Sequence, residues 1–372
     1  MHSLHDEKGV VKLFFENYSR QEIVAKAASS VSGLCDQAFH DGVLRLLYHL
    51  YFSPLALSCP PPPSLRLRVL GDLIKELETT GQEVPELAYR LHGQLSSSPR
   101  AASTDGHVVY QLTPVVSVPV WENRCLLAAD TTGLRTWQAG KALLDWYMLR
   151  PDGLKDRRVL ELGAGLGLTG LALCRLCQPK SYSITDGHPL VVQMLKYNVN
   201  KTLELVKDNL VMEDDAACAE FVASAADLTD LPEASAGPPE GGDTSDPGGD
   251  LRTTLDGTEL TVGKLDWFKF TAEDARKLDI DLVLTADVTY NPELHEPLVR
   301  TLSLVLDNVQ PAPQVLLALT DRNEDTTARL MRELASQGLK QRLLATPANN
   351  QSAFQMDEMS KVKMFDITRL EE

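Results

Sequence analysis

The sequence lacks the features expected of a membrane protein or of a protein that grips nucleic acid by its phosphates. No apolar run approaches the roughly 20 residues that a helix needs to span a bilayer. The opening MHSLHDEKGV is charged and has no apolar core, so we expect no secretory signal. A formal net charge of −16 over 372 residues leaves no excess of basic side chains for phosphate binding. We therefore expect a cytoplasmic protein that binds neither membranes nor nucleic acid directly.

Cysteines are few, and only one pair of the six is closely spaced. Cys174 and Cys177 form a C-x-x-C, but no second pair or histidine cluster completes a zinc site. They stand three residues apart in an apolar segment with helical spacing, which is typical of core residues. We therefore expect reduced thiols and no bound metal.

The first hundred residues are predicted to be helical. The segments VKLFFENYSRQEIVAKA, DGVLRLLYHLYF and LRLRVLGDLIKELE repeat apolar residues at intervals of three and four. The polar stretch SSSPRAASTDG then marks a boundary near residue 104. The sequence thus predicts a helical N-terminal module over residues 1–104, and none of its residues carries obvious chemistry.

Residues 105–372 have a different pattern. HVVYQLTPVVSVPVW and NRCLLAAD are β-rich and suggest a hairpin. From residue 133 helical and strand segments alternate, which predicts an α/β domain with a mostly parallel sheet covered on both faces. The closing KVKMFDITR is expected to add an antiparallel strand. Residues 231–250 are rich in Pro, Gly, Asp and Ser and are predicted to be a disordered insertion in a surface loop.

Two features predict a cofactor that carries a nucleoside. Gly163, Ala164 and Gly165 follow the first predicted parallel strand, where glycines allow a tight turn and close approach to a ligand. Asp186 ends the next strand, at the spacing from which a carboxylate accepts hydrogen bonds from ribose hydroxyls. Ligands of open α/β sheets bind at these carboxyl ends.

Adenosine is common to NAD and S-adenosylmethionine, and other residues separate the two. Glu161 lies two residues before the glycines, where a carboxylate repels a pyrophosphate but suits an ammonium and a sulfonium cation. Trp137 and Trp267 flank strand ends and can stack on adenine or wall in the methionine portion. Residues 165–170 do spell G-x-G-x-x-G, but this register starts two residues late, so we interpret Gly170 as a helix-packing residue.

The segment ADVTY is expected to complete the crevice from the end of a later strand. Asn291 already provides a cap for the helix that follows. Asp287 and Tyr290 are therefore predicted to be free of any capping role and to face the crevice, next to Ala286.

The motifs GLRTW, VLELGAGLGLTGLALCR, TDGHP, LDW and ADVTY together resemble the seven-strand, family-16 protein lysine methyltransferases. The resemblance covers residues 107–372 and is strongest to the subgroup that acts on elongation factor 2, which the helical N-terminal module also fits. It implies a Rossmann-like seven-strand sheet, S-adenosylmethionine as cofactor and a lysine of a translation factor as substrate. It implies that Asp287 and Tyr290 border that lysine, and it implies these cofactor contacts: Trp137, Gly163, Ala164, Gly165, Asp186, Trp267 and Ala286.

Three other functions stay open at this point. An NAD-dependent oxidoreductase would use residues 165–170 as its fingerprint, but no hydride-transfer acid is evident. A nucleic-acid methyltransferase would be expected to have an Asn/Asp-Pro-Pro-aromatic loop, and DVTY has no proline. A non-catalytic interaction protein would not need both the glycines and DVTY. The residues favour a methyltransferase over these three.

Overall fold

The computed structural model describes residues 2–123, 132–210, 215–235, 237–238, 249–346, 352–354, 356 and 361–370. The chain forms two compact units. The first comprises Met1–Cys125 and Lys201–Glu240, and the second comprises Leu126–Asn200 and Gly241–Glu372. None of the described helices is both long and apolar enough to cross a membrane.

The first unit is built around the predicted N-terminal helices. Their apolar faces form one core, because residues three and four apart lie on the same side of a helix. The helices are α1 (His2–Phe15), α2 (Arg20–Val31), α3 (Asp36–Leu47), η1 (Tyr48–Phe52), α4 (Pro54–Ser58), α5 (Pro63–Glu78) and α6 (Glu86–Ser97).

The first unit extends beyond the predicted boundary at residue 104. It includes the predicted antiparallel hairpin of β1 (Gly106–Thr113) and β2 (Val116–Glu122), and Val109 of β1 is buried in the helical core. It also includes α10 (Asp215–Ser224) and η3 (Ala225–Asp227), which contribute Cys218 and Ala225 to the same core. These segments belong to the first unit because they bury its apolar surface. NRCLLAAD lies almost wholly outside the described residues.

Residues 228–235, which include the first five residues of the predicted insertion, are hydrogen-bonded to the helices of the first unit. The Arg90 guanidinium donates to the carbonyls of Leu228 and Thr229 at 2.7 and 2.8 Å. The N–H of Ser235 donates to the Leu57 carbonyl at 2.8 Å. Residues 231–235 of the predicted insertion are therefore held in place, and most of residues 236–248 lie outside the described part of the chain.

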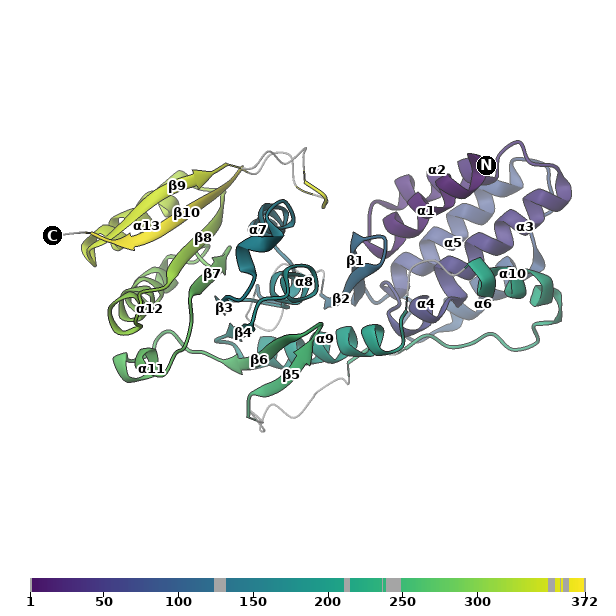
Figure 1. Ribbon diagram of the computed structural model, residues 1–372. Coiled ribbons are helices and arrows are strands. Elements are labelled where there is room, and N and C mark those ends of the chain that lie inside the picture. Colours follow the sequence, from purple (N-terminus) through teal and green to yellow (C-terminus); the bar gives the residue numbers. More distant parts are fainter. Residues whose placement is uncertain are drawn as a thin grey trace. The chain divides into compact units, whose positions relative to one another are not determined.

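The second unit contains an eight-stranded sheet with the order β5-β6-β4-β3-β7-β8-β10-β9 (Figure 1). Strands β6, β4, β3, β7 and β8 are parallel, and β10 runs antiparallel between β8 and β9. The predicted antiparallel strand KVKMFDITR is thus confirmed as β10. Strand β5 forms an antiparallel pair with β6, so it adds an edge strand to the expected seven. Neither β5 nor β9 was evident in the sequence pattern. The strands are β3 (Arg158–Leu162), β4 (Ser181–Asp186), β5 (Leu251–Leu255), β6 (Thr258–Lys264), β7 (Leu282–Ala286), β8 (Gln314–Asp321), β9 (Leu339–Ala345) and β10 (Lys361–Arg369).

Helices cover both faces of this sheet, as the alternating pattern predicts. Helices α7 and α8 lie on one face, and α12 and α13 lie on the other (Figure 1). Leu160 and Leu162 of β3 pack on the α12 side, so Glu161 between them points toward α8. The helices are α7 (Gln138–Met148), α8 (Leu168–Cys177), α9 (Pro189–Lys207), α11 (Ala272–Arg276), α12 (His295–Asn308) and α13 (Glu324–Ser336), with 3-10 turns η2 (Pro151–Leu154) and η4 (Pro292–Leu294). Cys174 and Cys177 are free thiols buried in α8, as predicted.

Candidate functional site

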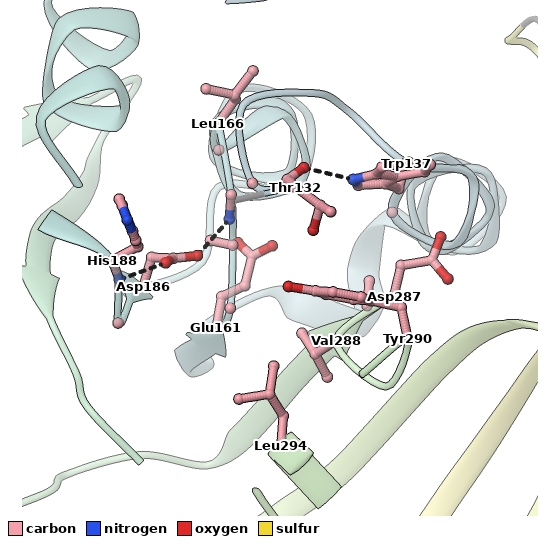
Figure 2. A pocket seen from close by; sticks show the side chains of 18 of the residues that line it. Thr132, Trp137, Glu161, Leu166, Asp186, His188, Asp287, Val288, Tyr290 and Leu294 are labelled. Carbon is pink, nitrogen blue, oxygen red and sulfur yellow. Dashed lines mark hydrogen bonds between the residues drawn. The ribbon is translucent and has the colours of Figure 1, made fainter. Parts of the chain in front are cut away.

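A cavity of about 420 Å³ opens at the carboxyl ends of β3, β4, β6 and β7 in the second unit (Figure 2). This volume falls within the range of small-molecule sites, about 300–1,000 Å³. The structure brings every predicted site residue to its wall: Trp137, Gly163, Ala164, Gly165, Asp186, Trp267, Ala286, Asp287 and Tyr290. The sheet topology causes this convergence, because all four strand ends meet at one edge.

The turn after β3 requires glycine for two reasons. Gly163 and Gly165 have φ of +67° and +57°, a conformation that side chains disfavour. A Cβ on Gly163 would also lie 2.5 Å from Val288 Cγ1 and 3.2 Å from the Trp267 ring. The turn therefore passes directly under the side chains of two other strand ends, and only a bare backbone fits there.

The literal G-x-G-x-x-G serves packing at its far end. A Cβ on Gly167 would lie 2.2 Å from Leu195 Cδ1, and one on Gly170 would lie 2.7 Å from Ile184 Cδ1 of β4. Gly170 lets α8 approach the sheet closely and is absent from the cavity wall. This agrees with the interpretation of Gly170 as a helix-packing residue.

Asp186 joins the glycine turn to the start of the next helix. Its Oδ2 accepts from the Gly165 N–H at 3.1 Å, and its Oδ1 accepts from the His188 N–H at 3.0 Å (Figure 2). Burial raises the pKa of the Asp186 carboxyl, and these two N–H donors act against the rise. A carboxylate has about four acceptor positions, so capacity remains for a ligand hydroxyl.

Glu161 is a buried acid in the cavity wall. Its side chain is 2% exposed and accepts a hydrogen bond from the Tyr182 hydroxyl at 3.0 Å. Burial raises the pKa of Glu161 to about 8, and the nearby Asp186 carboxylate adds to the rise. Tyr182 and the Gly170 N–H favour the ionised form and limit the shift. A cation in the cavity would favour ionised Glu161 in the same way.

The two tryptophans lie in the wall and are held by contacts of their own. The Trp137 ring N–H donates to the Thr132 carbonyl at 3.0 Å (Figure 2). The Arg322 guanidinium lies 4.8 Å from the Trp137 ring centre, which is cation–π geometry. Trp267 is fixed through its backbone, since Arg300 donates to its carbonyl at 2.7 Å. The Trp137 ring and the Trp267 backbone are therefore fixed parts of the cavity.

The prediction that Asp287 is free of a capping role is wrong. Its carboxylate accepts from the Ala139 N–H in the first turn of α7 at 3.0 Å, so it caps a helix from a distant part of the chain. It also accepts from the backbone and hydroxyl of Thr320 at 2.8 Å each. Asp287 is 8% exposed. Asn291 does cap the neighbouring helical turn, as predicted, but the helix that Asp287 caps contains Ala139, 148 residues earlier in the sequence.

Tyr290 lines the cavity with its side chain half exposed. Phe268, which no sequence motif indicated, lines the same cavity and is 62% exposed. Its backbone is fixed, because its N–H donates to Asp266 at 3.0 Å and its carbonyl accepts from Arg300 at 3.0 Å. An exposed aromatic ring on a fixed turn is suited to contact a ligand at the cavity mouth.

Several other wall residues were also missed. Most lie inside a motif already quoted, so membership of that motif was the available signal. They are Thr132, Gly133, Thr136, His188, Leu265, Val288 and Leu294. Among the described residues, no group of three or more His, Cys, Asp or Glu side chains is arranged to hold a metal ion.

Comparisons with known proteins agree with this geometry. The lysine methyltransferase family model matches residues 127–215 and 251–337. The gap between these ranges contains most of α10 and the predicted insertion. Protein-lysine N-methyltransferase EEF2KMT of Homo sapiens is 27% identical over 372 residues, which cover 98% of this chain and 99% of that protein. The protein of the same name from Bos taurus is 28% identical, with the same coverage of both chains. Protein-lysine N-methyltransferase EFM3 of Chaetomium thermophilum is 26% identical and covers 77% of this chain and 76% of that one.

Proposed function

This chain belongs to the lysine methyltransferase family, and we propose that it methylates a lysine of elongation factor 2. The chain is an S-adenosylmethionine-dependent protein-lysine N-methyltransferase, so its substrate is a protein. The proposed substrate is a translation factor, and we therefore also propose a cytoplasmic location.

The choice of elongation factor 2 is supported by the extent of the similarity. The proteins named EEF2KMT from Homo sapiens and Bos taurus match this chain over 98% of its length, including the helical region before the family match begins. A calmodulin-lysine N-methyltransferase of Arabidopsis thaliana, by contrast, matches 56% of this chain. Because the similarity extends beyond the methyltransferase region, we infer that this chain and these proteins share a substrate as well as a reaction.

The cavity fits S-adenosylmethionine by its shape and its acidic groups. The bare backbone at Gly163 leaves room that a Cβ would fill, and the acids Glu161 and Asp186 suit a cationic, ribose-bearing ligand. We propose that the cofactor is held by Trp137, Gly163, Ala164, Gly165, Trp267 and Ala286, with Asp186 on the ribose. When bound, S-adenosylmethionine supplies a methyl group on a positively charged sulfur, which an amine can attack.

The chain's own residues would prepare the lysine. A lysine amine attacks only when neutral, and its ordinary pKa is about 10.4. Tyr290 and Phe268 offer apolar walls at the mouth, and desolvation between them would lower the pKa of the amine. Asp287 is already bonded to Ala139 and Thr320, so we assign it to holding the site together. Alignment of the amine would then supply most of the rate.

The decisive experiment is methyl transfer to purified elongation factor 2 with S-adenosylmethionine labelled in its methyl group. We expect label in the protein, on lysine, and none in RNA supplied at equal mass. Tyr290→Ala should reduce the rate while leaving S-adenosylmethionine binding intact, because Tyr290 is assigned to the lysine and not to the cofactor. Absence of label in elongation factor 2, with label in another protein, would overturn the substrate but not the reaction.

A further inference from the structure

The Asp287 carboxylate joins three elements of the second unit, namely the loop after β7, the start of α7 and the end of β8. It belongs to the loop after β7 and accepts from the Ala139 N–H of α7 at 3.0 Å. The backbone N–H and the hydroxyl of Thr320, near the end of β8, each donate to it at 2.8 Å. Arg322 lies just past β8, with a guanidinium nitrogen 3.6 Å from the same carboxylate. Three hydrogen-bond donors and one nearby guanidinium therefore converge on this carboxylate.

The backbone at Asp287 has a conformation that needs such support. Its φ of +54° lies in the left-handed region, which is uncommon for residues other than glycine, although Asp adopts it more often than most. The Asp287 N–H donates to the Ala318 carbonyl of β8 at 3.0 Å, so the main chain and the side chain both attach this loop to β8. The strand pairing is thereby extended one residue past the end of β7.

Both sides of the cavity depend on this attachment. Downstream of Asp287, Val288 lies directly over Gly163, and Tyr290 lines the cavity. On the other side, Ala139 is two residues from Trp137, whose ring also contacts Arg322. The end of β8 therefore determines the spacing between the DVTY loop and the Trp137 wall, although Thr320 itself is absent from the cavity wall.

We propose that Thr320 is a positioning residue for methyl transfer: through Asp287 it fixes the loop that carries Tyr290 against the start of α7. This rests on the proposed role of Tyr290 at the substrate lysine. The hydroxyl is the essential group. Without the Thr320 hydroxyl, the buried Asp287 carboxylate has one hydrogen-bond donor fewer. We expect the carboxylate to shift, and its hydrogen bond with the Ala139 N–H to lengthen or break. Alignment of the lysine suffers more than cofactor affinity, because the Trp137 ring is also held by the Thr132 carbonyl and Asp186 is held by the N–H groups of Gly165 and His188.

The test compares Thr320→Val, which keeps the shape and removes the hydroxyl, with Thr320→Ser, which keeps the hydroxyl. Thr285→Val is the matched control, because Thr285 is fully buried in β7 and its hydroxyl has no hydrogen-bond partner among the described residues. Three quantities are measured in the full chain: hydrogen exchange of the Ala139 amide, the Kd for S-adenosylmethionine, and kcat for methyl transfer to elongation factor 2.

For Thr320→Val we expect faster exchange at Ala139 and a kcat about tenfold lower, which corresponds to about 1.4 kcal/mol. Its Kd should stay within about threefold of the wild type. Thr320→Ser and Thr285→Val should match the wild type in all three quantities. Unchanged exchange and kcat in Thr320→Val would overturn the proposal, as would an equal loss in either of the other variants. A wild type that fails to methylate elongation factor 2 would overturn the proposed substrate, while the Ala139 exchange would still decide the role of Thr320.

Discussion

The buried acid Glu161 should make the stability of the cofactor-free protein depend on pH near neutrality. Its pKa is about 8 in the folded protein, against an ordinary value of 4.5. Between these values the folded state holds a proton that the unfolded state has lost, so stability falls as pH rises. The contribution is complete below about pH 4.5 and is lost as pH rises through about 8. Between pH 6 and pH 8 the loss amounts to about 2 kcal/mol, at about 1.4 kcal/mol for each pH unit.

The variant Glu161→Gln isolates this effect, since glutamine has nearly the same shape and does not titrate. Urea unfolding of both proteins at pH 6, 7 and 8 gives the difference in their free energies of unfolding. Other titrating groups cancel in this difference, which should move by about 2 kcal/mol in favour of the variant as pH rises from 6 to 8.

A second variant should shift the pH range over which the protein loses stability. The Tyr182 hydroxyl stabilises the ionised form of Glu161, so Tyr182→Phe should raise the pKa of Glu161 further and move the loss of stability to higher pH. A difference between wild type and Glu161→Gln that stays constant from pH 6 to 8 would refute the reasoning. It would mean that Glu161 is ionised in the folded protein and that burial does not control its proton.

Three further outcomes are expected. Gly163→Ala should lower the free energy of unfolding by about 2–4 kcal/mol, because its backbone is left-handed and the new Cβ would clash with Val288. It should also weaken S-adenosylmethionine binding. The control Gly93→Ala, in a helix with open space around it, should neither lower stability nor weaken binding. Phe268→Ala should raise KM for the protein substrate and change stability by less than about 0.5 kcal/mol, and an unchanged KM would remove Phe268 from the substrate path. Deleting residues 1–104 should give an insoluble or dye-binding protein, because it uncovers the apolar side of α10 and of β1; a soluble monomer with native cofactor affinity would contradict this.

The sequence pattern was sufficient for the parallel strands and β10 of the sheet in the second unit, and for helices α7, α8, α9 and α12. Helix α8 has the bounds of the segment LTGLALCRLC, and strand β4 covers SYSITD. These segments are long enough for their periodicity to be unambiguous. Strands β5 and β9 were not evident because polar and charged side chains interrupt their alternation at the edges of the sheet.

The division of the chain could not be read from composition. Residues 201–240 fall between segments of the methyltransferase region in sequence, yet Leu205, Cys218 and Ala225 are buried with the N-terminal helices. Helix α10 carries no pattern that shows which apolar surface it will cover. Burial is a property of the surfaces that meet, and a segment of ten residues can pack on either unit.

The sequence by itself determined which residues gather at the site. Gly163, Asp186, Trp267 and Asp287 lie at or just after the ends of four different strands, and the carboxyl ends of parallel strands share one edge of a sheet. What each residue does there was decided by the tertiary structure. Asp287 has its hydrogen-bond partners 33 and 148 residues away, at Thr320 and Ala139, and no local motif records them. A buried carboxylate must pair with the donors that the fold brings to it. The role of Asp287 therefore follows from long-range packing and not from the local sequence DVTY.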